Sequence, residues 1–353
     1  MRLLFLTTHP TLAGRVLLAA QAMNAKVVIV SNGDSCLRHS RYCMKHLIMP
    51  FPCADASIEP FQSALAQIVE SNQVDVIVPI DVQAELVATR LQQTHLGAPM
   101  FPLAKIDAIE CLANKWRFYQ FALTLSLTVP ETYLIAHTDD GERLARSALQ
   151  YPLIAKPLDA QGGEGVERLD CPADLYRRVR SAQRDKALPI IVQRYIDGED
   201  LDISLLCTNG NVHAWAAHSH PSPDVRQFVT SPCVFHAAER IVHACTYSGV
   251  INMDFRVERP SGQCYVIEAN PRFWTTVHVS AWHGVNFLEL GCRISVGDQL
   301  GAVVTAEPGS YRLHKRLALD ILRLRNLRDV SRGNWAGFAA SLLDPLPLLM
   351  GAC

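Results

Sequence analysis

Short apolar runs alternate with amphipathic stretches along the N-terminal part of the chain. Residues 3–7, 26–30 and 74–80 are apolar runs of the length typical of buried strands. Residues 61–72 instead repeat their apolar positions with the period of a helix. Strands that alternate with helices indicate a parallel sheet covered by helices on both faces. The pattern therefore predicts an α/β domain in this part of the chain.

Two hairpins are predicted further along. GEDLDISLLCTNGNVHAWAAHSH reads as two strands joined by an Asn-Gly turn. A second hairpin joins VINMDFRVE (250–258) to CYVIEAN (264–270), and in its first strand apolar and polar residues alternate. Since side chains alternate between the faces of a strand, we expect Tyr265 and Ile267 to face the core.

The polar face of the second hairpin has the composition of a metal site. Asp254 is expected on the same face as Glu268, opposite or diagonal to it, where two carboxylates repel each other. A divalent cation would resolve this repulsion, and carboxylate and amide oxygens, such as that of Asn270, are ligands that Mg²⁺ prefers. Arg272 adds a planar fork for a phosphate or a carboxylate. An exposed, salt-linked sheet face is the alternative explanation.

A glycine-rich turn is a candidate for phosphate binding. Lys156 ends an apolar strand, and Gly162, Gly163 and Gly165 follow it closely. Backbone N–H groups of such a turn can approach phosphates, although turns also use glycine for purely conformational reasons. The chain has no G-x-x-x-x-G-K-[ST] and no H-R-D segment, which excludes a P-loop and a standard protein kinase. The first turn lacks G-x-G-x-x-G, so a dinucleotide is not expected there.

Composition narrows the class of protein. With 353 residues and 49% hydrophobic residues, the chain is expected to form two or three packed units. The 33 basic and 34 acidic residues balance, which argues against a nucleic-acid-binding protein. No apolar run reaches the roughly 18–20 residues of a membrane-spanning helix, and the apolar start is too short for a secretion signal. The 11 cysteines lack paired spacings, so we expect reduced thiols in a soluble, cytoplasmic protein without membrane partners.

In their order along the chain, these motifs resemble those of the ATP-grasp ligases, in the branch of the carbamoyl-phosphate synthetase large chain. The resemblance covers about residues 105–300 and implies an α/β (α+β grasp) fold. The implied parts are an α/β pre-ATP-grasp domain with a parallel sheet, an N-terminal and central grasp subdomain, a C-terminal grasp subdomain with the Mg-ATP site, and a short helical tail, at residues 1–104, 105–190, 191–305 and 306–353. The tail is basic and helical from Tyr311, and its end, LLDPLPLL, favours core or dimer packing over membrane docking.

The resemblance also assigns roles to single residues. Lysines and the glycine turn are implied to bind the phosphates of ATP, the strand VQRYI its adenine, and an acid its ribose. Gln193 replaces the family's usual Glu, and its amide oxygen can still accept the adenine amino proton. The implied ATP-binding residues are Lys115, Lys156, Gly162, Gly163, Gly165, Gln193, Arg194, Ile196 and Asp200, the metal ligands are Asp254, Glu268 and Asn270, and the catalytic residues are Arg272 and Lys156.

The activity implied by the resemblance is that of an ATP-dependent carboxylate–amine ligase. It would form an amide through an acyl phosphate, release ADP and phosphate, and use ATP with Mg²⁺ or Mn²⁺. Small, amino-acid-like carboxylates and amines are the implied substrates, and a homodimer is the implied assembly. Carboxylation, carbamoylation and a non-catalytic ATP-binding module are the alternatives.

Other polar residues leave two explanations open. Asp81 follows a predicted strand, where it could bind a ligand or cap the next helix. His278 and Trp282 share a helix face, which could line a substrate pocket or pack in the core. His218 and His220 have metal-like spacing, but no acidic or cysteine partner follows them, so surface or pocket histidines are the favoured interpretation.

Overall fold

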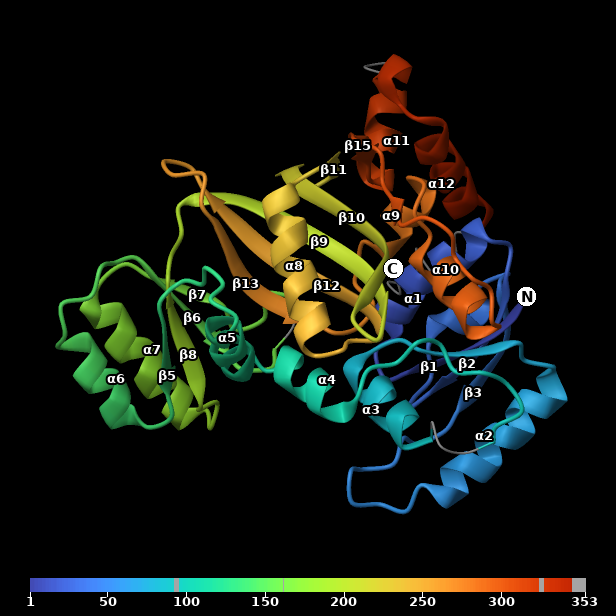
Figure 1. The fold of residues 1–353 in the computed structure, drawn as a ribbon, viewed down its shortest axis with the longest axis horizontal. Helices are drawn as coiled ribbons and strands as arrows, with labels where there is room; N and C mark the ends of the chain where they lie inside the picture. The colour runs from blue at the N-terminus through green and yellow to red at the C-terminus, as the bar shows by residue number, and fades with distance from the viewer. Residues whose placement is uncertain (92–94, 161, 324–326, 345–353) are drawn as a thin grey trace. The chain divides into compact units, whose positions relative to one another are not determined.

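The computed structural model describes residues 1–91, 95–160, 162–323 and 327–344 (Figure 1). The chain divides into two compact units, each built from separate segments. The first unit comprises Met1–Ile109, Asp202–Asn252 and Asn270–Cys353, and the second comprises Glu110–Leu201 and Met253–Ala269. This division does not follow the four consecutive segments expected from the sequence, which remain a prediction about domains.

A parallel sheet with strand order β3-β2-β1-β4 lies in the first unit. Alternate residues of β1 face opposite ways: Leu3 and Phe5 pack with residues of α1, and Leu4 and Leu6 with residues of α2 and α3. Helices therefore cover both faces, which confirms the predicted α/β arrangement. The elements are β1 (Arg2–Thr7), α1 (Pro10–Ala22), β2 (Lys26–Ser31), η1 (Cys36–His39), β3 (Cys43–Ile48), α2 (Glu59–Asn72), β4 (Val76–Pro79) and α3 (Val82–Leu91).

The second unit contains an antiparallel sheet with strand order β5-β8-β6-β7. Helices α6 and α7 lie side by side, and residues of both pack with the sheet in one hydrophobic core (Figure 1). At the start of α5, the side chain of Asn114 accepts hydrogen bonds from the backbone N–H groups of Trp116 and Arg117, which fixes Lys115 at the first helical position. The elements are α4 (Ile106–Ala113), α5 (Lys115–Thr124), β5 (Thr132–Ile135), α6 (Thr138–Ala145), β6 (Leu153–Pro157), β7 (Glu167–Leu169), α7 (Pro172–Arg184) and β8 (Ile190–Arg194).

The largest sheet has strand order β13-β12-β9-β10-β11-β15, with β14 paired to β10. Asn209 and Gly210 form the turn between β9 and β10 with φ of 49° and 80°, as the Asn-Gly signal predicts. Helix α8 packs on β10 through Trp215 and Phe235, whose ring centroids are 4.9 Å apart. The elements are β9 (Gly198–Thr208), β10 (Asn211–Ser222), β11 (Val225–Val229), α8 (Pro232–Ala244), β12 (Gly249–Glu258), β13 (Cys264–Asn270), β14 (Val304–Thr305) and β15 (Gly309–Arg312).

Burial along β13 differs from the expected alternation. Val266 and Ala269 are the buried residues of this strand, at 2% and 5% exposure, whereas Tyr265 and Ile267 are only half-buried. The backbone N–H of Val266 donates to the carbonyl of Thr128 at 3.0 Å, so another segment of the chain lies along this strand. Tyr265 instead lies beneath the guanidinium of Arg194, 5.2 Å from its ring centroid. The expectation that Tyr265 and Ile267 face the core is therefore wrong: the buried residues Val266 and Ala269 are three apart, so neither face of this strand is covered along its whole length.

The C-terminal segment begins with a strand. Tyr311 is fully buried in β15, so the predicted helical tail starts a little later, at His314. Asp344, just after the last helix, accepts hydrogen bonds from the side chains of Gln21 and Ser40 and from the backbone of Arg41, at 3.2, 2.5 and 3.0 Å. Residues 345–353, which include most of LLDPLPLL, lie outside the described residues. The remaining elements are α9 (Val277–Trp282), α10 (Phe287–Ser295), α11 (His314–Leu322), η2 (Leu327–Asp329) and α12 (Arg332–Leu343).

Replacing Asp344 with alanine is expected to lower the free energy of unfolding by about 2–4 kcal/mol, because three donors lose a buried, charged acceptor. Urea denaturation would measure the loss. The matched control is Asp298→Ala, which removes only a half-exposed ion pair with Arg293 and should cost less than about 1 kcal/mol. Equal effects of the two substitutions would show that Asp344 does not anchor the C-terminal helix.

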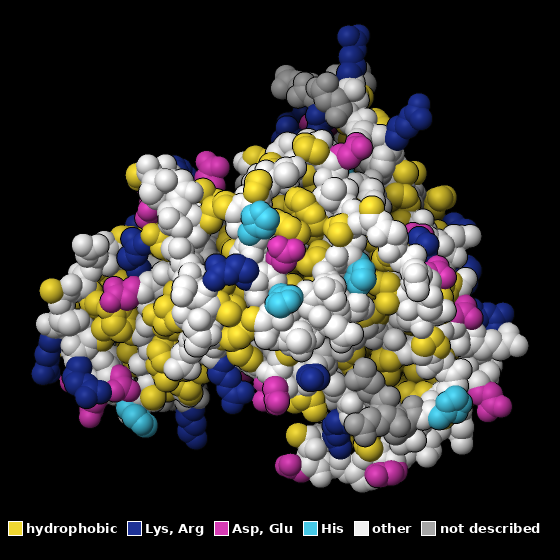
Figure 2. Space-filling model, in the orientation of Figure 1, with side chains coloured by type: hydrophobic (Ala, Val, Ile, Leu, Met, Phe, Trp, Pro, Cys, Tyr) yellow, Lys and Arg dark blue, Asp and Glu magenta, His cyan; other side chains and the backbone are white. Residues whose placement is uncertain are grey.

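The surface charge, the helices and the cysteines of the described residues can be compared with the expectations from composition. On the face shown in Figure 2, Lys and Arg side chains are interspersed with Asp and Glu side chains. None of the helices described is both long and apolar enough to cross a membrane. The ten cysteines in these ranges are free thiols.

Candidate active site

Two lysines and two carboxylates come together in the second unit. Lys156, on β6, is buried at 8% exposure. Lys115 Nζ lies 3.6 Å from Glu268 Oε2 and donates a hydrogen bond to the carbonyl of Ala160 at 2.7 Å. Burial lowers the pKa of Lys156, and the nearby Glu268 and Asp254 carboxylates oppose this effect. The structure thus groups three residues that separate sequence motifs indicate, Lys156, Asp254 and Glu268, with Lys115, which the family resemblance implies.

The charges of this cluster suit a polyanion. Lys115 lowers the pKa of Lys156, as expected for two positive groups held near each other. A desolvated ammonium interacts more strongly with an anion than an exposed one does, because the local dielectric constant is low. The carboxylates of Glu268 and Asp254 balance part of the positive charge of the lysines.

The glycine turn after β6 has the backbone geometry that requires glycine. Gly162, Gly163 and Gly165 have φ of 64°, 80° and 68°. A Cβ at Gly165 would also lie 2.7 Å from Cγ of Pro157, whereas nothing lies within 4 Å of a Cβ built at Gly162 or Gly163. The first two glycines therefore leave open space beside the backbone, as a phosphate-binding turn requires. Gln161 lies outside the described residues.

The end of β8 carries the residues expected to contact adenine. Gln193 is buried, and its Nε2 donates to Oγ1 of Thr132 at 3.0 Å, which leaves the amide oxygen available for another donor. The backbone N–H of Arg194 donates to the carbonyl of Glu131 at 2.8 Å. This N–H is therefore already used by the protein and does not bind a ligand in this arrangement.

Arg256, which no sequence motif indicates, holds the next part of this segment. Its Nε donates to the carbonyl of Ile196 at 2.5 Å, and its Nη1 pairs with Asp200 at 2.7 Å. Its Nη2 donates to the hydroxyl of Tyr195 at 3.1 Å. One guanidinium thus holds both a carbonyl and a carboxylate of the predicted nucleotide site. The available signal was its position two residues after Asp254, on the same face of β12.

Asn270 and Arg272 belong to the first unit. Arg272 is buried, and it donates from Nη1 to the carbonyl of Phe273 at 2.6 Å and from Nη2 to Oδ1 of Asn270 at 3.3 Å. The structure therefore joins these two residues to each other. Their roles as metal ligand and as stabiliser of phosphoryl charge remain predictions, because Asp254 and Glu268 belong to the other unit.

Asp81 organises the loop after β1 and the start of α3. Its carboxylate accepts hydrogen bonds from the Thr7 hydroxyl at 2.9 Å, from the backbone N–H of Thr8 at 2.7 Å and from that of His9 at 3.2 Å. It also accepts from the backbone N–H of Ala84 at 3.1 Å, which is a helix-capping contact. These contacts support the capping explanation rather than a ligand-binding role.

Glu85, one helical turn later, is an unusual buried acid. Burial raises its pKa well above the ordinary value of 4.5, Asp81 raises it further, and Arg272 opposes the shift. Its Oε2 has no hydrogen-bond partner among the described residues. No sequence motif indicates Glu85, because in the sequence it is one more polar residue of an amphipathic helix.

At neutral pH, the free energy of unfolding of the Glu85→Gln variant is expected to be about 1–3 kcal/mol higher than that of the wild type, so the variant is more stable. A raised pKa means that folded Glu85 keeps a proton that the unfolded chain releases. The stability linked to that proton is complete below the ordinary pKa of 4.5 and is lost as pH rises toward the folded-state pKa. Urea denaturation across pH should show a gap between the two proteins that opens above pH 4.5. Parallel curves, like those expected for the exposed control Glu70→Gln, would contradict a protonated Glu85.

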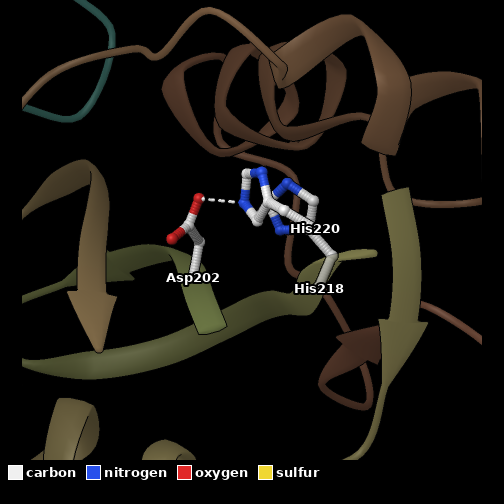
Figure 3. Close-up of side chains that lie close together, drawn as sticks. All are labelled: Asp202, His218 and His220. Atoms are coloured by element: carbon white, nitrogen blue, oxygen red, sulfur yellow. Dashed lines mark hydrogen bonds and ion pairs between the residues drawn. The ribbon is translucent and has the colours of Figure 1, made fainter. Parts of the chain in front are cut away.

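A cluster in the first unit corrects the interpretation of the paired histidines. His218 is 3% exposed and so is not a surface residue. Nε2 of His220 lies 2.8 Å from Oδ2 of Asp202, on β9 (Figure 3). The acidic partner does not follow the histidines but precedes His220 by 18 residues. The spacing could not show this, because a shift of one residue in strand register turns a side chain to the other face.

His278 and Trp282 have different surroundings on α9. His278 is 3% exposed, and burial lowers its pKa well below the ordinary value, so it is a core residue. Trp282 lines a hollow of about 640 Å³, together with residues that include His283, Thr305, Glu307 and Arg328. Of the pair, Trp282 lines this hollow, and His278 is not among the residues that line it.

Comparison with known proteins gives consistent matches. Residues 112–220 match the family described as "ATP-grasp domain", and residues 186–314 match the family described as "ATP-grasp in the biosynthetic pathway with Ter operon". The chain is 24% identical over 211 residues to the carbamoyl phosphate synthase large chain of Thermoanaerobacter sp. (strain X514), an alignment that covers 55% of this chain and 19% of that protein. The chain therefore spans about a fifth of the length of this relative.

Solved structures share the fold. The biotin carboxylase domain of the Hydrogenobacter thermophilus 2-oxoglutarate carboxylase aligns with a TM-score of 0.67 and 16% identity, over 87% of this chain and 73% of that one. The L-amino acid ligase from Bacillus licheniformis aligns with a TM-score of 0.61 and 18% identity, over 84% of this chain and 74% of that one. The family matches cover the segments that hold Lys115, Lys156, Asp254 and Glu268. The chain therefore belongs to the ATP-grasp superfamily.

Proposed function

We propose that the chain is an ATP-dependent ligase that joins a carboxylate to an amine through an acyl phosphate and releases ADP and phosphate. The observation that carries this proposal is the cluster of Lys115, Lys156, Asp254 and Glu268 within one unit. Membership of the ATP-grasp superfamily supports it, and so does the fold shared with an L-amino acid ligase.

The lysines would hold and stabilise the phosphoryl group during its transfer. Phosphoryl transfer depends mainly on positioning and on electrostatic stabilisation, and Lys156 supplies a desolvated positive charge for both. Gly162, Gly163 and Gly165 would let the turn close over the phosphates. Closure would exclude water, which would otherwise hydrolyse an acyl phosphate.

The strand after the glycine turn would bind the nucleoside. The amide oxygen of Gln193 would accept a hydrogen bond from the adenine amino group, next to backbone groups of Arg194 and Ile196. Asp200 would bind the ribose hydroxyls, with its carboxylate oriented by Arg256. Because Arg256 already occupies the carbonyl of Ile196, adenine contacts at this residue would use other backbone atoms.

The carboxylates of Asp254 and Glu268 supply the oxygen ligands that a hard divalent cation prefers. With ATP bound, the two neighbouring lysines would pair with its phosphates, and the carboxylates would then be available to the cation. Asn270 would complete the ligand set, and Arg272 would stabilise the charge of the transferred group. Magnesium, or manganese in its place, would neutralise phosphate charge there.

The chemistry would proceed in two displacements. A carboxylate oxygen of the first substrate attacks the γ-phosphorus of ATP, and ADP leaves. The nitrogen of the amine then attacks the acyl carbon, the bond to phosphate breaks, and the amine loses a proton as the amide forms. Both substrates would be small and amino-acid-like, and a homodimer is the predicted assembly.

Carboxylation or carbamoylation is the second candidate. The Hydrogenobacter thermophilus domain is described in complex with MgADP, ADP and bicarbonate and as a dimer. Bicarbonate in the carboxylate position would give a carboxylated or carbamoylated product by the same first displacement.

Nucleotide product analysis would test these proposals. The protein is incubated with Mg-ATP and pooled amino acids and small carboxylates, with or without bicarbonate, while ADP, AMP and phosphate are followed and condensed products are sought by mass spectrometry. ADP and phosphate that depend on a carboxylate–amine pair would support the ligase. Dependence on bicarbonate would support the second candidate, and AMP with pyrophosphate would rule out the acyl phosphate. ATP binding without turnover under every condition would favour a non-catalytic module.

A further inference from the structure

Two histidines and an aspartate come together on neighbouring strands of the first unit. His218 and His220 lie two residues apart on β10, and Asp202 lies on the adjacent strand β9. One potential ligand atom from each residue can be chosen so that all three lie within 4.8 Å of one another. Figure 3 shows the carboxylate of Asp202 directed at the ring of His220, with the His218 ring beside it. The centroids of the two rings are 5.0 Å apart.

The cluster is buried on one side and open on the other. His218 is 3% exposed, whereas the side chains of His220 and Asp202 are 29% and 19% exposed. The ring of His218 stacks on Phe228 at 5.7 Å, and its Nε2 lies 3.5 Å from the hydroxyl of Thr276. The buried ring is thus held in place, while an ion could reach the other two residues from solvent.

We propose that Asp202, His218 and His220 bind a divalent transition-metal ion of the zinc class. Two imidazoles and one carboxylate are a frequent ligand set for such ions, which prefer nitrogen ligands more than Mg²⁺ does. Bond lengths of about 2.0–2.2 Å would place the ligand atoms about 3.3 Å apart in a tetrahedral site. In the structure, His220 Nε2 lies 2.8 Å from Asp202 Oδ2, and the potential ligand atoms of the three residues lie within 4.8 Å of one another. Small side-chain rotations would bring these atoms to the separation of a tetrahedral site.

Arg226, on β11, indicates what the open coordination position would take. Its guanidinium interacts electrostatically with both Asp202 and His218. Its Nη1 donates to backbone carbonyls, but its buried Nε has no hydrogen-bond partner among the described residues. A lone cation would be repelled by this charge, whereas a metal ion with a small anion, such as a carboxylate, as its fourth ligand would not. A metal ion bound with such an anion is therefore the expected occupant.

This proposal does not depend on the ligase activity, because it is argued from Asp202, His218 and His220 alone, and none of them is among the residues proposed to bind ATP or its metal. The alternative is a hydrogen bond between Asp202 and His220 that serves the fold alone. In that case removal of the carboxylate would change stability but not metal binding.

Titration with Co²⁺, followed by visible absorption, would separate these explanations. The chelator-treated full chain would be titrated with excess Mg²⁺ and ADP present, so that the proposed ATP site is occupied by Mg²⁺. We expect one equivalent of Co²⁺ to bind with the strong absorption of a four-coordinate, nitrogen-containing site, and Zn²⁺ to displace it. Asp202→Asn and His220→Gln are each expected to weaken binding about 100-fold or more, as loss of a ligand should cost at least as much as loss of a supporting contact.

A matched control comes from a histidine outside the cluster. His236→Gln removes a largely exposed imidazole of α8 and should leave the Co²⁺ spectrum and affinity unchanged. Circular dichroism and ADP binding would show that each variant is folded, and Asp202→Asn keeps the size of the side chain if His220→Gln fails to fold. Co²⁺ binding that is equal in wild type and Asp202→Asn, or no such absorption in the wild type, would overturn the proposal.

Discussion

The Lys156→Met variant is expected to fold normally and to lose about 10²–10³-fold or more in the rate of ATP-dependent ligation. Lys156 is buried, at 8% exposure, and burial lowers its pKa. A phosphoryl group placed beside it would gain a strong interaction that no water molecule can replace. Methionine has a similar length but provides no charge.

Stability should change little in this variant. Methionine removes the cost of burying an ammonium, and Glu268 still has Lys115 as an ion-pair partner at 3.6 Å. A large loss of turnover with an unchanged midpoint of urea denaturation would therefore report on the chemistry rather than on folding.

Steady-state kinetics with the substrate pair found by product analysis would measure the effect. Lys315→Met, which changes an exposed lysine of α11, serves as the matched control and should have wild-type turnover. If Lys156→Met turned over ATP at the control rate, the phosphate-binding role of this residue would be wrong.

Local pattern was enough to predict the parallel sheet and the hairpins. Leu3 to Leu6 are all apolar, and in the structure they face two separate cores in alternation, as a strand covered on both faces must. The Asn-Gly turn at residues 209 and 210 was equally informative, since both have the positive φ that this dipeptide tolerates. These features depend on neighbours in the sequence, which are visible without a structure.

Contacts between distant residues were harder to predict. Arg256 donates to Ile196 and Asp200, and the pairing depends on where two segments meet in space. The same is true of Asp202, whose partner His220 lies 18 residues away on the next strand. A pattern of alternation predicts which residues share a face of one strand, but not which residue of a neighbouring strand lies opposite.

The candidate site combines features that local sequence predicts with contacts between distant residues that it does not. The sequence motifs indicated Lys156 and Glu268 separately, and the resemblance to a family added Lys115 and assigned all three a common ligand. The structure adds the ion pair between Lys115 and Glu268 and the burial of Lys156, neither of which a motif contains. The structure also divides the predicted metal ligands between two units: Asn270 is close to Glu268 in the sequence but belongs to the other compact unit.

Glu268→Gln is expected to reduce Mg²⁺-dependent ligation by about 10²-fold or more while leaving the binding of nucleotide without metal unchanged or tighter. Glu268 lies 3.6 Å from Lys115 and is the main group that opposes the lowered pKa of Lys156. Glutamine keeps the shape of the side chain but removes its charge. The two lysines would then lack a counter-charge and attract the phosphates of ATP at least as well, whereas a divalent cation would lose a carboxylate ligand.

Two measurements separate these effects. Titration of ADP in the presence of a chelator reports on the lysines, and turnover across a range of Mg²⁺ concentrations reports on the cation. Glu199→Gln, at an exposed position of β9, is the matched control and should change neither. Weaker binding of metal-free ADP would mean that Glu268 mainly positions Lys115, and turnover with wild-type Mg²⁺ dependence would remove Glu268 from the metal site. A carboxylate that binds the metal ion beside two phosphate-binding lysines makes one combined prediction for Glu268→Gln. The variant should lose turnover but bind metal-free ADP as tightly as the wild type or more tightly.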